Sequence, residues 1–415
     1  MARCPRITVV TSGHLSTCPR MLKSADALAG AGYDVRVVAT STDGWAIDAD
    51  RDVRSRRAWP ATIINYRRGE SGQTYWRTGV RARASRAVVD WLGAERAPLP
   101  LIARTIGRVH SELVRAIAAE PTDLVYGGTT GALAAIAEGA RRIGAPYALD
   151  LEDFHSAEFG GSQALRKTVM IKRIEDAVLP RAAFLTTSSE YIAEAYRQQY
   201  GVVSSVVHNT FPLPEQAPSF TRVEPQRLRV YWFSQTIGPG RGLDEAVVAL
   251  GQAGVSAVLA LRGRDWGGYL EGLTRLAAER APRLEVQHQQ PAAPDTMVDR
   301  ARGYDVGLAL EQMVPLNRAL CMSNKAFTYL LAGVAVILTD TPGHHAFGQD
   351  VGSAGVLVRP GDIERLASVF RQWADNPSML EAAKRAAWDA AVRRWHWDHP
   401  KERGVLLNLV SAALH

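Results

Sequence analysis

The sequence has little of three features that would each have placed the protein in a particular class. It holds only three cysteines in 415 residues, at positions 4, 18 and 321, and none has a CxxC or other metal-ligand spacing. Its longest strongly apolar run, YLLAGVAVIL, is about half the length that crosses a bilayer. The opening MARCPRITVV has only a short apolar run, unlike a signal peptide. We therefore expect reduced thiols and a cytoplasmic protein rather than a disulfide scaffold.

Lysine is absent and acidic residues are scarce in one part of the chain. Residues 51–115 hold 14 arginines, no lysine and 5 acids, within a net charge of +7 for the whole chain. The aromatic residues interleaved with these arginines are Trp59, Tyr66, Tyr75, Trp76 and Trp91. The pattern fits either a solvated surface or an anionic partner, such as lipid head groups in peripheral contact or a phosphorylated acceptor. Nucleic acid is not expected, because no zinc-finger, RRM or basic-zipper pattern accompanies the charge.

Strand-like and helix-like patterns alternate in both halves of the chain. Apolar runs such as RITVV, YDVRVVAT, TDLVYG and PYALDLE are separated by amphipathic stretches, and after a proline-rich segment the alternation restarts at LRVYWFS. This alternation predicts parallel sheets with helices on both faces. We expect an α/β protein of two Rossmann-like, doubly wound domains that face a central cleft, because loops at the carboxyl ends of parallel strands form binding crevices.

The expected boundaries follow from the same alternation. A first domain covers 1–207, a linker 208–227, a second domain 228–385 and a helical tail 386–415. Within the first domain, 51–100 is poorly periodic and is interpreted as an elaboration. The next stretch, LIARTIGRVHSELVRAIAAE, predicts one amphipathic helix.

The stretch LEDFHSAE places three carboxylates and an imidazole directly after a strand-like run. At that position its side chains are expected to face the crevice, and His155 is the candidate for ligand contact. Asp150 and Asp153 also fit as caps of a following helix. No metal is expected, since neither HExxH nor EF-hand order is present, and no GxSxG motif supports a serine hydrolase.

A glycine-rich loop follows the strand-like LRVYWFS in the second half. Glycines in QTIGPGRG allow the backbone to approach a ligand closely, and the helix that begins at LDEAVV offers amides with partial positive charge. Arg241 adds a cation that suits phosphate oxygens. The loop therefore predicts an anion site.

A second helix start, SNKAFTYLLAG, strengthens that interpretation. Ser323 or Asn324 is the natural N-cap, and Lys325 in the first turn opposes the helix dipole. An anion bound nearby would explain this unfavourable placement. The two strand-to-helix crossings are expected to be neighbours, so Arg241 and Lys325 would reach one diphosphate.

These stretches are similar to a known family. VYWFSQTIGPGRGLDEAVVAL, YDVGLALE and SNKAFTYLLAGVAVILTDTPG resemble the donor-binding half of GT-B glycosyltransferases of the retaining family 4 type. TSGHLSTCPRMLKSADALAGAGYDVRVVA, LDLEDFHSAE and VVHNTFPLP resemble its N-terminal half and hinge, and RRWHWDHP with LLNLV resembles the terminal helix that crosses back. The resemblance covers nearly the whole chain except about 51–100.

The resemblance implies transfer of a sugar from a nucleoside-diphosphate sugar to a hydroxyl of a glycan, a lipid-linked or a natural-product acceptor, with retention. Fixed cations would neutralise the leaving diphosphate, so no metal or other cofactor is expected. Glu311 near the sugar and His155 from the opposite wall are the candidate catalytic residues, and His14 and Arg20 are expected on the acceptor side. The residues expected at the donor are Ser234, Gln235, Gly240, Arg241, Asn324, Lys325 and Thr328, the last in place of the family's ribose-binding glutamate.

Two other functions stay open on the sequence alone. A non-catalytic nucleotide-sugar-binding protein would share the scaffold, and the missing second glutamate leaves room for it. A dehydrogenase would use the glycines of LVYGGTTGALAAIAEG with Asp150 as the ribose carboxylate. However, Gly127, Gly128 and Gly131 do not fit GxGxxG.

Overall fold

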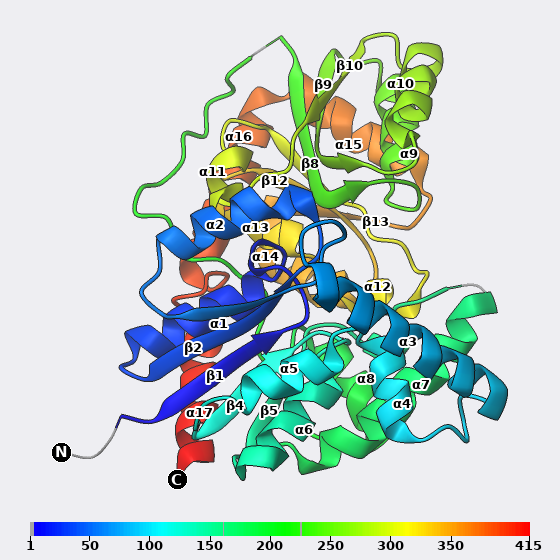
Figure 1. The fold of residues 1–415 in the computed structure, drawn as a ribbon. Coiled ribbons are helices and arrows are strands. Elements are labelled where there is room, and N and C mark those ends of the chain that lie inside the picture. Colours follow the sequence, from blue (N-terminus) through cyan, green and yellow to red (C-terminus); the bar gives the residue numbers. More distant parts are fainter. Residues whose placement is uncertain (1–3, 161, 225) are drawn as a thin grey trace. The chain divides into compact units, whose positions relative to one another are not determined.

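Two parallel β-sheets organise the chain, one in each of its two units (Figure 1). The first unit comprises Met1–Val207 with Arg403–His415, and the second comprises His208–Glu402. The computed structural model describes residues 4–160, 162–224 and 226–415. The predicted α/β class with two Rossmann-like sheets is confirmed.

The first sheet has seven parallel strands in the order β3-β2-β1-β4-β5-β6-β7. Its strands are β1 (Arg6–Thr11), β2 (Asp34–Ser41), β3 (Ala61–Asn65), β4 (Leu124–Gly128), β5 (Tyr147–Leu151), β6 (Leu185–Thr187) and β7 (Ser205–Val206). The central strands are apolar along their length because helices cover both faces; Ile7, Val9 and Val10 of β1 are all fully buried.

The helices of this unit lie between successive strands of the sequence, except for one that comes from the end of the chain. They are α1 (Pro19–Gly30), α2 (Ile47–Ser55), α3 (Gly72–Leu92), α4 (Leu99–Ile106), α5 (His110–Ile117), α6 (Leu133–Ile143), α7 (Ser162–Val178), α8 (Glu190–Tyr200) and, from the chain's end, α17 (Val405–Leu414). Four short 3₁₀ turns accompany them, at Leu15–Thr17, Gly44–Ala46, His155–Ala157 and Leu179–Arg181. The helix α17 packs against α1, which ties the chain's end to the first unit.

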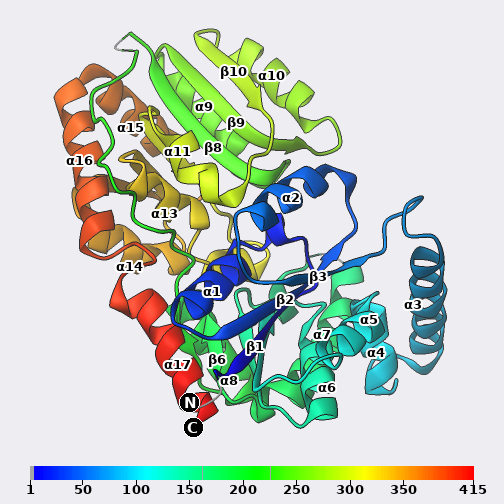
Figure 2. The same cartoon turned by 60° about the vertical axis from the view of Figure 1, so that its left-hand side comes forward.

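The segment interpreted as an elaboration, 51–100, contains regular structure. It ends α2, supplies the edge strand β3 and forms the whole of α3, which packs on α4 rather than on the sheet (Figure 2). The periodicity is weak because β3 is an edge strand with no fully buried residue, and because α3 has apolar residues on its solvent side as well. A helix in a second layer does not need the single apolar stripe that sequence patterns detect.

The single helix predicted over 101–120 is wrong, because the chain bends between α4 and α5 at Gly107. A Cβ at Gly107 would stand 2.5 Å from the carbonyl oxygen of Gly131. Two glycine backbones therefore meet at a distance that no side chain allows. This close approach depends on residues far apart in the sequence, which local periodicity does not reveal.

The second sheet has six parallel strands in the order β10-β9-β8-β11-β12-β13. These are β8 (Leu228–Ile237), β9 (Ala257–Asp265), β10 (Leu284–Gln289), β11 (Val306–Ala309), β12 (Ala335–Thr339) and β13 (Gly355–Val358). The helices are α9 (Leu243–Ala253), α10 (Tyr269–Arg280), α11 (Met297–Ala301), α12 (Leu316–Leu320), α13 (Asn324–Leu331), α14 (Pro342–Val351), α15 (Ile363–Asp375) and α16 (Pro377–Arg393), with short turns at Pro294–Thr296, Gly352–Ala354 and Pro400–Gly404.

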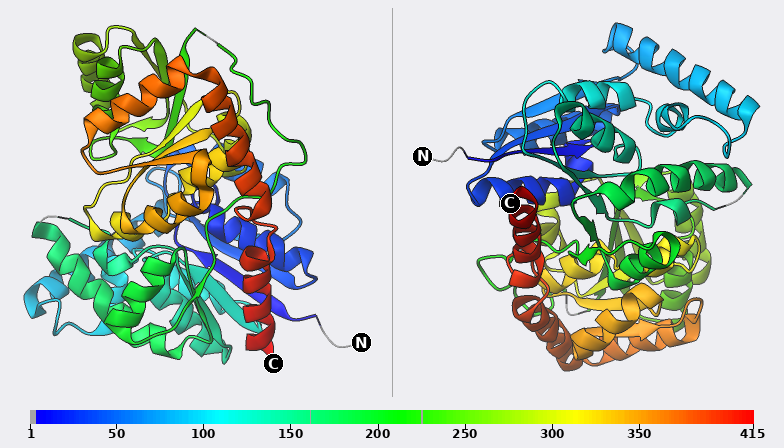
Figure 3. Two further views of the ribbon diagram at one scale, coloured as in Figure 1. Left: turned by 180° about the vertical axis from the view of Figure 1, so that it is seen from behind. Right: turned by 90° about the horizontal axis from the view of Figure 1, so that it is seen from below.

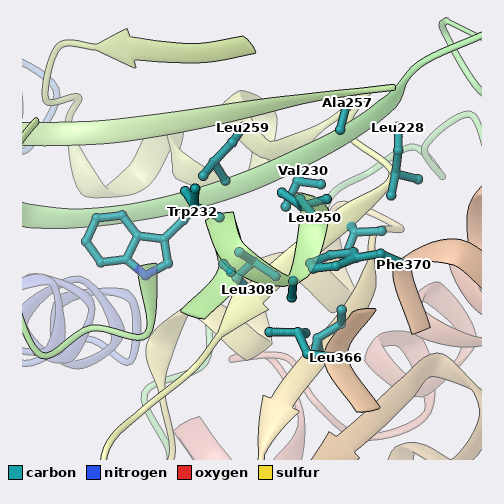
Figure 4. Packing of buried hydrophobic residues seen from close by; sticks show 14 of the residues in the cluster. Leu228, Val230, Trp232, Leu250, Ala257, Leu259, Leu308, Leu366 and Phe370 are labelled. Carbon is teal, nitrogen blue, oxygen red and sulfur yellow. The ribbon is translucent and has the colours of Figure 1, made fainter. Parts of the chain in front are cut away.

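Alternate residues of β8 face opposite sides of this sheet. Leu228, Val230 and Trp232 pack toward α9 and α15 in the cluster that Figure 4 shows, together with residues such as Phe370. Tyr231 points to the other side and packs with α11 and α13. The continuous apolar run of β8 is thus explained by burial on both faces.

The tail predicted over 386–415 is divided between the units. The helix α16 packs within the second unit, whereas Arg403–His415 belongs to the first (Figure 3). Trp395 anchors the segment between them by packing against Phe327 and Phe347. Across the described ranges, no helix is both long and apolar enough to span a membrane.

Candidate active site

The glycine-rich loop after β8 is shaped by two residues with left-handed backbone conformations. Gly240 has φ +68° and Gly242, which caps α9, has φ +73°. A Cβ at Gly242 would also overlap Cβ of Leu310, the residue after β11. Glycine is therefore required where the start of α9 meets the end of β11, and this approach brings Arg241 close to the groups that follow β11.

Arg241 is a half-buried cation without a counterion of its own. Within the residues that the structure describes, its guanidinium makes no hydrogen bond or ion pair. Burial and the nearby charge of Arg318 lower the pKa of Arg241, and only Glu311 acts in the opposite direction. Arg318 is held at the same loop, because its Nη1 donates to the Gly240 carbonyl at 2.6 Å. Two guanidiniums therefore gather at one loop.

Glu311 follows β11 and forms a buried ion pair with Lys325 in the first turn of α13. The Lys325 Nζ donates to Glu311 Oε1 at 2.5 Å, and Ser323 Oγ donates to the same oxygen at 3.1 Å. The Lys325 ammonium also lies over the ring of Trp232, 5.7 Å from its centroid. Burial alone would raise the pKa of Glu311, but the positive charges of Lys325 and Arg241 and the nearby His344 lower it to about 2.

His344 holds the backbone at the start of α13 through a hydrogen bond to Ser323. Its Nε2 accepts from the Ser323 backbone N–H at 3.2 Å, so its Nδ1 is the nitrogen that donates to the Thr339 carbonyl at 3.1 Å. The ring is fully buried, and burial lowers the pKa of His344. This imidazole is therefore neutral and structural.

These contacts change the explanation for Lys325 and add Arg318 to the cluster. The anion that explains Lys325 at a helix start is Glu311 of the same unit, so the lysine's position by itself does not require a ligand. Sequence reasoning also missed Arg318, which lies in the short helix α12 and gives no periodic signal. With Arg318 included, the described residues place three cations and one carboxylate, that of Glu311, in this cluster. The cluster keeps excess positive charge.

Four other residues expected at the donor lie near this cluster or in the strand before it. Ser234 and Gln235 belong to β8, which runs beyond the predicted end and has a register irregularity between residues 233 and 236. Asn324 is the first residue of α13, after the N-cap Ser323. Thr328 is fully buried and its hydroxyl donates to the Asn324 carbonyl at 3.2 Å, so this geometry gives no support to a ribose contact.

His155 lies in the first unit, in the 3₁₀ turn after β5. Its Nδ1 pairs with Glu158 Oε1, and Thr130 Oγ1 donates to the same carboxylate at 3.1 Å. Burial would lower the pKa of His155, but Glu158, with smaller contributions from Glu175 and Asp153, raises it to about 9. The Nε2 atom is buried and has no hydrogen-bond partner among the described residues. The ring is thus held by one nitrogen and available through the other.

The two residues expected on the acceptor side are fully bonded within the unit. His14 pairs through Nδ1 with Asp50 at 2.6 Å, while its Nε2 accepts from the backbone N–H groups of residues 42 and 43. Arg20 is 2% exposed and donates to Asp150 at 2.6 Å and to two backbone carbonyls. Both side chains therefore stabilise the first unit through these contacts.

Asp150 and Glu152 have different environments although they are two residues apart. Asp150 is the buried partner of Arg20 and also accepts from Thr186 Oγ1 at 2.6 Å, so it is neither a helix cap nor a free ribose ligand. Burial, with the charge of Asp153, raises the pKa of Glu152 to about 7. A carboxyl that titrates near neutrality at the end of a strand is a candidate functional group that sequence patterns did not single out.

The described residues hold no metal cluster, and one cavity of the first unit is lined by other residues. In the described part of the chain, no three His, Cys, Asp or Glu side chains are grouped to hold a metal. A cavity of about 360 Å³ lies elsewhere in this unit, and its walls are Ile63, Ile64, Asn65, Thr74, Arg77, Glu112 and Arg115. It is therefore separate from His155.

Comparison with known proteins identifies the fold and one domain of the chain. Residues 19–210 match the model of the glycosyl transferase 4-like domain. Solved structures similar to the whole chain include HepE from Anabaena in complex with UDP and glucose, with 16% identity, a TM-score of 0.63 and 99% of each chain covered. Among curated proteins, none has significant sequence similarity to this chain.

Two other solved structures have the same architecture. Sucrose-phosphate synthase from Thermosynechococcus elongatus has 13% identity and a TM-score of 0.68 over 98% of each chain. A TarM variant from S. aureus, in complex with fondaparinux, α-GlcNAc-glycerol and UDP, has 10% identity and a TM-score of 0.69 over 99% of this chain and 100% of its own. The chain therefore has the GT-B fold of these structures, and its residues 19–210 match the glycosyl transferase 4-like domain.

Proposed function

We propose that the protein transfers a sugar from a nucleoside-diphosphate sugar to an acceptor hydroxyl, with retention of the anomeric configuration. The second unit would bind the donor, with Arg241 and Arg318 on the diphosphate. The acceptor would be a glycan, a lipid-linked sugar or a natural product.

The unpaired guanidinium of Arg241 carries this proposal. A half-buried cation beside a second cation is unfavourable until an anion arrives, as the lowered pKa of Arg241 reflects. A diphosphate would supply that anion, and the N–H groups at the start of α9 would add hydrogen bonds. The solved structures of HepE and TarM, which contain UDP, support the choice of a nucleotide as its carrier.

The same groups would stabilise the leaving diphosphate during transfer. Negative charge grows on the diphosphate as the bond to the sugar breaks, and fixed cations lower the energy of that state without reorganising. Glu311 would act mainly by holding Lys325, since the ion pair and the contact with Trp232 determine where the ammonium lies. No step in this scheme requires a metal or other cofactor.

His155 is the proposed contribution of the first unit. With Nδ1 held by Glu158, the ring keeps Nε2 for a hydrogen bond to a sugar hydroxyl. A raised pKa makes the ring a cation at neutral pH, so Nε2 would act as a donor. This role is more consistent with the geometry than nucleophilic attack, because an imidazolium has no free lone pair.

A thermal-shift screen with UDP-, GDP-, dTDP- and ADP-sugars tests the donor. A true donor adds about 2.7 kcal/mol to the free energy of unfolding at a concentration of 100 times Kd, and this raises the unfolding midpoint. No shift with any of them would contradict the proposal. Slow donor hydrolysis without acceptor separates the enzyme from a non-catalytic nucleotide-sugar-binding protein, which would be stabilised and release no sugar.

A further inference from the structure

The helix α3 presents one side to the first unit and the opposite side to solvent. Its buried residues are Thr78, Ser85 and Val89, which repeat at helical spacing and face α4. Figure 3 shows the helix at the periphery of its unit (right view). The composition of the solvent side is therefore not explained by packing within the unit.

That solvent side is apolar. Trp76 is 62% exposed, Val80 59%, Val88 39% and Trp91 84%. At about 100° per residue these four side chains fall within one third of the helix circumference, roughly opposite Thr78, Ser85 and Val89. The two tryptophans stand at the ends of this stripe, about 22 Å apart along the axis. Exposed apolar stripes of this length mark binding surfaces more often than ordinary solvent contact.

Arginines lie within and beside the stripe on the same helix, because at about 100° per residue Arg77 falls between Trp91 and Val88 and Arg83 falls next to Trp76. Within the described ranges, Arg77, Arg83 and Arg86 make no hydrogen bond or ion pair. The single acidic residue of α3, Asp90, is neutralised by Arg166 of α7, and Arg81 pairs with Glu112. The stripe thus has uncompensated positive charge within it and beside it.

We propose that this side of α3, defined by Trp76, Val80, Val88 and Trp91 with these arginines, binds flat on an anionic lipid bilayer. Tryptophan prefers the boundary between head groups and acyl chains, and valines would enter the same boundary. The guanidiniums would contact lipid phosphates. Apolar side chains alone would not distinguish an anionic from a neutral surface, so the arginines define the lipid class.

A second copy of the chain fits this surface less well. A two-fold interface would place the arginines of one copy against the same arginines of the other, and these like charges would repel. Nucleic acid would satisfy the guanidiniums but leave Val80 and Val88 without apolar contacts. The inference is independent of the donor chemistry, because it uses only α3.

Co-sedimentation of the full chain with lipid vesicles tests whether α3 binds an anionic bilayer. One set consists of phosphatidylcholine alone, and the other contains about one quarter phosphatidylglycerol. The chain should partition into the anionic vesicles at least about tenfold more strongly than into the neutral ones, and added salt should weaken this binding. Tryptophan emission should shift to shorter wavelength on anionic vesicles.

One variant removes the exposed tryptophans of α3, and a second removes its arginine charges. Trp76→Ala/Trp91→Ala and Arg77→Gln/Arg83→Gln/Arg86→Gln should each lower partitioning onto anionic vesicles about tenfold or more, and the first should also remove the emission shift. The matched controls are Trp266→Ala, at a tryptophan that is 64% exposed in the second unit, and Arg275→Gln/Arg359→Gln/Arg385→Gln, which removes the same charge from exposed positions there. Both controls should partition like the original chain.

Equal binding to both vesicle sets, no binding, or full binding by either α3 variant would overturn the proposal. Self-association in the absence of lipid that the α3 variants abolish would replace it with an interface between copies. Donor-induced thermal stabilisation, measured on the same samples, separates the two proposals. Failure on vesicles with normal stabilisation by donor would overturn the lipid surface and leave the proposed transferase function unaffected.

Discussion

The two candidate sites differ in how far their positive side chains are balanced by nearby carboxylates. Around His155 in the first unit, the imidazole is matched by Glu158 and surrounded by further carboxyl groups, so its positive charge is stabilised and its pKa rises to about 9. Around Arg241 in the second unit, Arg241, Lys325 and Arg318 share Glu311 as their carboxylate among the described residues, and the pKa of Arg241 is lowered by burial and by Arg318. The positive charge of His155 is therefore balanced within its own unit, whereas the cations around Arg241 would be balanced by an added anion.

This difference separates a hydrogen-bonding group from an anion-binding one. A matched imidazolium is held in one orientation and can offer a directed N–H donor. Unmatched guanidiniums raise the energy of the empty site, and an incoming diphosphate relieves it. Substitutions that change the charge balance or the backbone at either site test this difference.

Arg241→Ala should have the largest effect. Removing a fixed charge from a leaving diphosphate costs about 3–4 kcal/mol of barrier, so kcat/KM for transfer should fall about 10²–10³-fold and stabilisation by donor should weaken. The fold should be unaffected, since Arg241 has no internal partner in the described residues. Steady-state kinetics and thermal shift measure both quantities.

The matched control is Arg275→Ala, an exposed arginine of the same unit whose partner Glu271 is also exposed. It should behave like the original protein. If Arg241→Ala kept normal turnover and donor affinity, the contrast between the two units would have no functional meaning.

Acid should break the buried ion pair between Glu311 and Lys325. The pKa of Glu311 is about 2 in the folded chain and near 4.5 in the unfolded chain, so its stabilising contribution is complete above pH 4.5 and is lost as the pH falls toward 2. The loss amounts to about 3 kcal/mol. Thermal midpoints of Glu311→Gln should therefore fall less steeply over this range than those of the original chain.

Glu271→Gln, at a side chain that is 82% exposed, provides the reference for nonspecific acid effects. An identical acid slope in Glu311→Gln and in the unmodified protein would mean that Lys325 is not held by this carboxylate in solution.

Glu158→Gln creates a mismatch in the first unit. The folded pKa of His155 lies above its unfolded value of 6.5, so its stabilisation is complete below pH 6.5 and disappears as the pH rises through 9. The substitution should lower the pKa of His155 and remove about 2 kcal/mol at pH 6, because Glu175 and Asp153 retain part of the effect. An NMR titration of His155 measures the pKa, and the alkaline limb of the activity profile should move to lower pH.

Glu194→Gln is the control, because its carboxylate pairs with Arg197 on the surface of the same unit. A titration of His155 that does not move in Glu158→Gln would remove the explanation for its raised pKa, and with it the assignment of Nε2 as a donor.

A pair of glycine substitutions separates backbone shape from charge at the Arg241 loop. Gly240 and Gly242 have nearly the same positive φ, but only Gly242 has no room for a Cβ, which would meet Leu310. Gly242→Ala should destabilise the chain by about 1–3 kcal/mol more than Gly240→Ala. Chemical unfolding measures the difference, and equal losses would show that the close approach to β11 is absent in solution.

Most of the architecture could be predicted from local patterns. The alternation of apolar strands and amphipathic helices determined two parallel sheets, and the glycines before LDEAVV indicated a tight turn into α9. His155 and Arg241 were singled out because strand ends carry the binding loops of such sheets. The secondary structure of 51–100 could not be predicted in this way, because neither α3 nor β3 is buried on one clear face.

The order of the residues thus establishes which side chains can carry charge at the ends of the strands. Which of those charges are paired depends on how the chain folds. Lys325 meets Glu311 across a strand-to-helix crossing, Arg20 meets Asp150 130 positions away, and Arg318 reaches Gly240 over 78 positions. An ion pair depends on distances of a few ångströms between segments that packing brings together, and sequence spacing contains no such distances.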